Sequence, residues 1–86
     1  MIKMNVIIAN NTGLHARPAS ELVKLCKRFH SDMQIQSKDA DANPKNLISV
    51  LSGGFIKGTE IEFTVEGEDE VEAAKEIKKY MDNLIS

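Results

Sequence analysis

The chain has 86 residues, a formal net charge of −2 and a sequence pI near 5.6. This length suits one domain, residues 1–86, with a small core and no room for a deep pocket or an inserted cofactor domain. A slightly acidic chain has no diffuse positive field, which argues against sequence-independent binding to nucleic acid or anionic lipid. We therefore expect chemistry at the surface, without a cofactor.

The cysteine and histidine content excludes two further classes of site. Cys26 is the single cysteine, so no intramolecular disulfide can form, and the two histidines lie fifteen positions apart, which matches no metal-site spacing. The apolar stretch at the N-terminus is too short to span a bilayer and lacks the features of a signal peptide. These observations predict a cytoplasmic protein with no metal and no membrane insertion.

The first half of the chain predicts a strand and a helix. Residues 2–9 have a period of two, with Met4, Val6 and Ile8 alternating with Lys3, Asn5 and Ile7, as in a strand with one buried face. Residues 10–13 all favour turns. Apolar residues then recur at helical spacing from near His15 to about Phe29, which predicts the first helix.

The middle of the chain predicts two strands and a short helix. Residues 32–37 alternate again, and a short edge strand is expected at 40–43 because Pro44 stops its ladder. Asn46 can cap a short helix over residues 47–51.

The remaining pattern predicts one more strand and a final helix. Residues 60–66 alternate strictly, and the buried face of the last helix is expected to comprise Val71, Ala74, Ile77, Met81 and Leu84. The order β-α-β-β-α-β-α predicts an α+β fold with helices on one face of a four-stranded sheet and water on the other.

His15 lies where the first helix is expected to begin, which is a favourable place to hold an anion. The first N–H groups of a helix have no partner within it and lie at the positive end of its dipole. The N–H groups of Ala16 and Arg17 would point to the space beside the imidazole, where the Arg17 guanidinium can bind a phosphate. Pro18 has no N–H and costs little there, and Gly13 lets the preceding loop approach closely.

An uncharged imidazole at this place can act as a nucleophile toward a phosphoryl donor. The N–P bond that results is labile, so the group can be passed on. We therefore expect His15 and Arg17 to carry the chemistry, with no metal. Spacing alone leaves open an alternative, in which His15 is a surface residue at a helix start without chemistry.

Three segments closely resemble the HPr family of the bacterial phosphoenolpyruvate:sugar phosphotransferase system. They are TGLHARPAS, KNLISVLSGGFIKG and EIEFTVEGEDEVEAAKEI. The resemblance implies an open-faced β-sandwich of four antiparallel strands under helices. It also implies that Nδ1 of His15 accepts a phosphoryl group from phosphorylated enzyme I and donates it to the A domains of sugar-specific enzyme II permeases. Arg17 would assist, while Ala16 and Pro18 at the helix start would complete the phosphate site.

One position departs from the pattern of the family. Where members commonly have a serine that a regulatory kinase phosphorylates, this chain has Asn46. Asparagine caps a helix as well as serine does, but it cannot be phosphorylated. Ser49 and Ser52 lie inside or at the end of the short helix and are poor substitutes. We therefore expect no regulatory phosphorylation site.

The short helix has more apolar residues than so small an element can bury. We expect part of them to form, with the outer side of the first helix, an apolar docking surface with a basic rim that suits acidic partners. This docking surface comprises Ser20, Lys24, Lys27, Leu47, Ile48 and Leu51. The alternative interpretation makes Leu47 and Leu51 ordinary core residues. Of the three apolar residues in this set, Ile48 is the one that we expect to be buried.

Two classes of function remain open from the sequence. The first is a monomeric phosphocarrier that uses His15. The second is a regulatory binding module of the same fold, or a paralogue in a nitrogen-related phosphorelay, that acts mainly by binding other proteins.

Overall fold

Seven elements follow one another in the expected order β-α-β-β-α-β-α in a computed structural model, which describes residues 1–84. They are β1 (Ile2–Ile7), α1 (Ala16–Lys27), β2 (Asp32–Ser37), β3 (Asp41–Ala42), α2 (Leu47–Ser52), β4 (Glu60–Glu66) and α3 (Glu70–Asp82). No helix among these residues is long and apolar enough to cross a bilayer.

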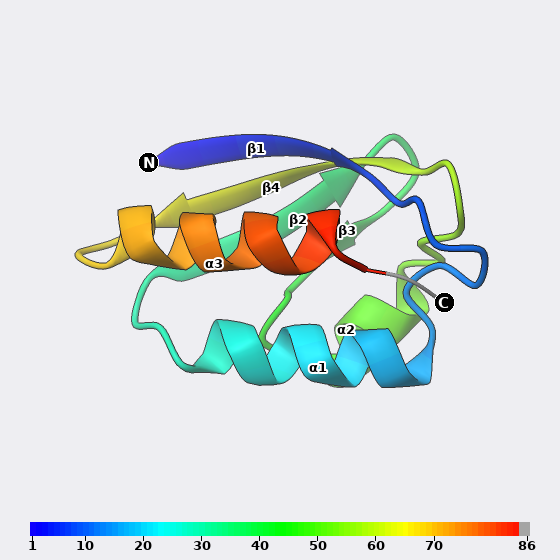
Figure 1. Ribbon diagram of the computed structural model, residues 1–86, viewed down its shortest axis with the longest axis horizontal. Coiled ribbons are helices and arrows are strands. Elements are labelled where there is room, and N and C mark those ends of the chain that lie inside the picture. Colours follow the sequence, from blue (N-terminus) through cyan, green and yellow to red (C-terminus); the bar gives the residue numbers. More distant parts are fainter. Residues whose placement is uncertain (85–86) are drawn as a thin grey trace.

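The four strands form one antiparallel sheet in the order β1-β4-β2-β3. All three helices lie on the same side of this sheet, and its other face is bare (Figure 1). The predicted open-faced α+β architecture is therefore confirmed. The chain leaves β1 and enters α1 through a loop at one end of the sheet, which is where His15 lies.

The alternation in the strands separates a core face from a polar face. Ile35 of β2 lies opposite Phe63 of β4, and both side chains are completely buried beneath the helices. On the other face, Asn5 lies opposite Glu62, which in turn lies opposite Gln36. Because successive side chains of a strand point to opposite faces, one sequence pattern produces both surfaces.

Two residues of the expected α3 face differ from the expectation: Leu84 lies past the end of the helix, where it is half-buried, and Val71 points the wrong way. Val71 is 71% exposed, whereas Ala73 and Ala74 are buried together with Ile77. At about 100° of rotation per residue, Val71 lies roughly 120° around the helix from Ile77. The Val71 side chain therefore points away from the sheet. Ala73 is buried where the sequence pattern predicts Val71.

Two elements end earlier than expected, and hydrogen bonds continue the structure past their ends. β1 ends at Ile7, yet the N–H of Ile8 donates to the Thr59 carbonyl at 2.9 Å. α1 ends at Lys27, and the N–H of Phe29 donates to the Cys26 carbonyl at 3.2 Å in a tighter turn.

The turn between α1 and β2 is fixed from two sides. Nζ of Lys45 donates to the carbonyl oxygens of Phe29, at 2.9 Å, and Ser31, at 2.7 Å. The Asp69 carboxylate, before α3, accepts bonds from the N–H groups of His30 (2.8 Å) and Ser31 (3.0 Å) and from the Ser31 hydroxyl. These segments, distant in sequence, hold the end of α1 that lies away from His15.

Candidate functional site

His15 is the N-cap residue of α1, as the sequence predicts. Its backbone is extended, with φ −82° and ψ −172°, and its carbonyl accepts the Ala19 N–H at 2.9 Å. The side chain is exposed and makes no capping hydrogen bond. His15 therefore starts the helix with its backbone alone, and no hydrogen bond within residues 1–84 occupies its ring nitrogens.

The first turn of α1 offers free amides and no negative charge. Ala16 and Arg17 are the first two residues of the helix, and their N–H groups have no hydrogen-bond partner within residues 1–84. Pro18, which has no N–H to satisfy, is buried. The first turn contains no acidic residue. An anion beside His15 would thus meet unpaired donors and the positive end of the helix dipole.

Arg17 is exposed and reaches toward α3. It lines a groove of about 420 Å³ between α1 and α3, together with Glu21 and Tyr80. The Tyr80 hydroxyl lies 2.9 Å from Oε1 of Glu21 and 3.2 Å from the Pro18 carbonyl oxygen, so its single proton is shared between these two acceptors. Burial and the Glu21 carboxylate raise the pKa of Tyr80, while the charge of Arg17 opposes them. Glu21 thus has a hydroxyl partner, and Arg17 makes no ion pair in the described part of the chain, so its guanidinium remains available to an anion.

Gly13 allows the loop before His15 to pack directly on another loop. It has φ +65°, and a Cβ atom at this position would lie 2.3 Å from the Phe55 carbonyl oxygen. The next residue, Leu14, is buried and donates its N–H to that same oxygen at 2.8 Å. This close approach is to the loop that carries Phe55, and it anchors the backbone that leads into His15.

The docking surface expected beside His15 is exposed on α2. Leu47 is 38% exposed and Leu51 is 42% exposed, while Ile48 is 75% exposed, so the expectation of burial for Ile48 is wrong. A six-residue helix presents only one side to the core, and Val50 occupies it. Figure 1 shows α2 beside the N-terminal half of α1.

The residues expected to form the rim of this surface lie on α1. Lys24 and Lys27 are exposed and Ser20 is half-buried. Ile56, in the loop after α2, is a further exposed apolar residue that the sequence pattern does not single out; it is 68% exposed. That loop has no periodicity from which its exposure could be read, although Ile56 directly follows the buried Phe55.

Asn46 caps α2, as predicted. Its side-chain oxygen accepts the Ser49 N–H at 3.0 Å. The hydroxyl of Ser49 accepts the Asn43 N–H at 2.8 Å, so this serine has a structural role of its own.

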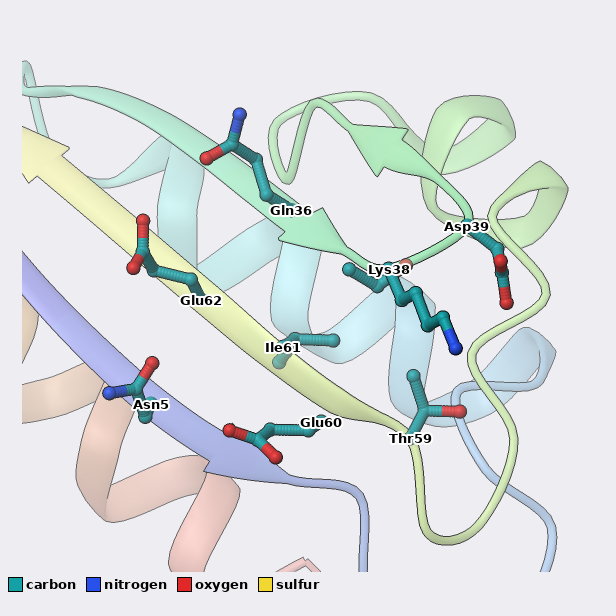
Figure 2. A pocket seen from close by; sticks show the side chains of 9 residues that line it. Asn5, Gln36, Lys38, Asp39, Thr59, Glu60, Ile61 and Glu62 are labelled. Atoms are coloured by element: carbon teal, nitrogen blue, oxygen red, sulfur yellow. The ribbon is translucent and has the colours of Figure 1, made fainter.

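A hollow of about 580 Å³ on the open face of the sheet involves none of the predicted site residues. Figure 2 shows the residues that line it, with Glu60 and Glu62 of β4 between Asn5 of β1 and Gln36 of β2. They form a shallow polar surface, which fits the expectation that this face of the sheet is in water.

Two other residues with potential chemistry have ordinary surroundings. Cys26 is fully buried, and burial raises the pKa of its thiol to about 12, so the reactive thiolate form is suppressed. His30 is exposed just after α1, as expected. Within residues 1–84, no cluster of histidine, cysteine and carboxylate side chains could hold a metal ion.

A family model described as the PTS HPr component phosphorylation site matches residues 2–83. The chain belongs to the HPr family. Similar proteins include the phosphocarrier protein HPr of Mycoplasma capricolum subsp. capricolum, 37% identical over 94% of this chain and 91% of the relative. HPr of Vibrio cholerae serotype O1 is 34% identical over 98% and 99% of the two chains.

The fold of this HPr-family protein matches solved HPr structures. The crystal structure of HPr-C-His from Thermoanaerobacter tengcongensis superposes with a TM-score of 0.90 at 32% identity, covering 95% of this chain and 92% of that one. Both the family and the architecture expected from the sequence are therefore confirmed. The general role that follows is that of a phosphocarrier in the phosphotransferase system.

Proposed function

We propose that this HPr-family protein carries the phosphoryl group on His15. The observation that carries the proposal is the exposed imidazole at the N-terminus of α1. Neither it nor the amides of Ala16 and Arg17 has a hydrogen-bond partner among residues 1–84, and the first helical turn contains no acidic residue. A helix N-terminus of this kind stabilises the negative charge of a phosphoryl group.

The transfer needs only a nucleophile and groups that stabilise charge. The lone pair of Nδ1 attacks phosphorus, an N–P bond forms, and the bond between phosphorus and the donor breaks with its electron pair leaving on the donor. The Ala16 and Arg17 amides and the Arg17 guanidinium would bind the phosphoryl oxygens. Pro18 would contribute by fixing the first helical turn. The reverse displacement, with an acceptor nucleophile, passes the group on.

We assign enzyme I as the donor and the A domains of enzyme II permeases as the acceptors. The exposed apolar side chains of α2 and the lysines of α1 support a small docking surface beside His15. A surface of this kind suits transient association with acidic partners. We further propose that the protein acts as a cytoplasmic monomer.

We propose that this protein is not regulated through a phosphoserine at the start of α2. Asn46 stands at the cap and already satisfies the helix amide of Ser49. Incubation with ATP and the regulatory kinase of the family should therefore leave the protein unlabelled, whereas Asn46→Ser should supply both the cap and an acceptor hydroxyl.

The chain offers a matched control for testing His15, because its only other histidine, His30, is also exposed. The protein, His15→Ala and His30→Ala are each incubated with enzyme I and labelled phosphoenolpyruvate. We expect acid-labile, base-stable label on the wild type and on His30→Ala, and none on His15→Ala. A wild type that binds enzyme I without gaining label would instead favour the regulatory binding module.

A further inference from the structure

Asn10, at the start of the loop that leads to His15, is a polar residue in the core. Its side chain is only 4% exposed. Nδ2 donates to the Gly13 carbonyl oxygen at 2.7 Å, and the Asn10 backbone carbonyl accepts the Gly13 N–H at 3.1 Å. Asn10 therefore holds Gly13 by two hydrogen bonds that close one tight turn.

The second polar atom of this side chain is left without a partner. Oδ1 of Asn10 is buried and accepts no hydrogen bond, and it is the one such buried side-chain atom found in residues 1–84. A carbonyl oxygen can only accept, so the amide nitrogen must face Gly13 and Oδ1 must point the other way. An unpaired buried oxygen is unfavourable. The bond to Gly13 is thus kept although half of the amide group is unsatisfied.

This bond fixes one particular peptide group. The peptide unit between Gly13 and Leu14 has its oxygen held by Asn10 Nδ2 and its N–H held by the Phe55 carbonyl at 2.8 Å. A peptide unit is planar, so fixing both of its polar ends fixes its orientation. Only Leu14, which is itself buried, lies between this fixed plane and His15.

We propose that Asn10 is a positioning residue for phosphoryl transfer at His15. The inference rests on the proposed function of His15. Asn10 sets the direction in which the chain enters α1, and with it the alignment of the imidazole with the free amides of Ala16 and Arg17. Transfer rates depend steeply on such alignment, because misplacing a reacting group by a fraction of an ångström lowers the population of reactive geometries.

The neighbouring Asn11 provides a matched control. It is exposed, and its Oδ1 accepts a bond from Lys57 Nζ at 2.9 Å. Asn11 is thus the same residue type in the same loop as Asn10, but it does not bind the peptide unit between Gly13 and Leu14. Phosphorylation by phosphorylated enzyme I is measured at steady state for the wild type, Asn10→Ala and Asn11→Ala. We expect Asn10→Ala to lower kcat at least tenfold with KM for enzyme I changed less than twofold. Asn11→Ala should change neither constant by more than twofold.

Other outcomes separate the two proposals. A wild type that never accepts phosphate overturns the role of His15 itself. Normal labelling of the wild type with an unchanged kcat in Asn10→Ala overturns only the positioning role, as does a rise in KM with kcat preserved.

A second measurement uses only the wild-type protein, so it does not depend on whether a variant folds. In the unmodified protein, the side-chain NH₂ protons of Asn10 and the amide proton of Leu14 should exchange with solvent at least tenfold more slowly than the side-chain NH₂ protons of Asn11. Equal exchange rates for the two asparagine side chains would overturn the proposal.

Discussion

The backbone of Gly13 lies so close to Phe55 that a Cβ atom at position 13 would be 2.3 Å from the Phe55 carbonyl oxygen. Gly13→Ala should therefore lower the free energy of unfolding by more than about 2 kcal/mol, from the collision and from the positive φ together. Gly54 is the matched control, since it has the same φ of +65° but open space around it. Gly54→Ala should cost only about 1 kcal/mol. Chemical denaturation measures both values, and equal losses would show that the close approach contributes nothing.

Replacing Arg17 with alanine should separate transfer from stability. The side chain is exposed and makes no ion pair among the described residues, so the melting temperature should change by no more than about 2–4 °C. Phosphoryl transfer should slow at least roughly tenfold, because a charge-assisted hydrogen-bond donor to the phosphate is lost. Arg17→Lys should recover part of the rate, since it keeps the charge without the two-pronged geometry. A large fall in melting temperature for Arg17→Ala would instead indicate a structural role in the groove beside Tyr80.

The exposure of Ile48 predicts that its substitution affects docking and not folding. Ile48→Glu should leave the free energy of unfolding within about 0.5 kcal/mol of the wild type, because the side chain is 75% exposed. The same change should weaken binding to enzyme I about tenfold or more, since it places a negative charge in the proposed docking surface, which we expect to meet an acidic partner. Calorimetric titration with enzyme I measures the affinity.

Val50 gives the opposite case on the same helix. It is fully buried, so Val50→Ala should cost roughly 2 kcal/mol in stability. The affinity of the Val50→Ala variant for enzyme I should stay close to that of the wild type as long as the variant is folded. Unchanged affinity in Ile48→Glu would remove α2 from the docking surface.

The stability of the protein should fall in acid, partly through Asp69. Hydrogen bonds from the Ser31 hydroxyl, and from the His30 and Ser31 amides, lower the pKa of this carboxyl from its ordinary value of 3.8. The ionised form is therefore favoured in the folded state. Its contribution is complete above pH 3.8 and is lost as the pH falls through the lowered pKa.

Melting temperatures between pH 2 and pH 7 test this link. Asp69→Asn should be less stable than the wild type at pH 7 and should lose less stability on acidification. Glu68→Gln changes an exposed neighbour, and its melting temperature should fall with decreasing pH as steeply as that of the wild type. Parallel curves for the wild type and Asp69→Asn would contradict the prediction.

The features that follow local periodicity could be predicted from the sequence. Alternation in residues 60–66 gave both the buried face of β4 and its polar face, and the turn residues before His15 gave the start of α1. Cap chemistry was also readable, because the contact between Asn46 and Ser49 spans only three residues.

The rest depends on contacts between distant segments. No local pattern shows that Lys45 and Asp69 each bind Ser31 in the turn after α1, or that Tyr80 binds Glu21 across the two long helices. The pattern places Val71 on the buried face because Val71 is apolar and lies in the first turn of α3. Its angular position around the helix axis nevertheless turns it away from the core. The sequence predicts for Asn10 only a place in a turn, because the burial of its side chain depends on the packing of the loop as a whole.

The burial of Cys26 has a practical consequence for following this protein in solution. Because its thiol is both covered and poorly ionised, and because the sequence contains no other cysteine, a maleimide dye should react slowly with the native chain. A cysteine introduced at Gln36, on the bare face of the sheet, would then be the single fast-reacting handle. A fluorophore attached there would leave the helical side unobstructed and would report complex formation through its rotational diffusion.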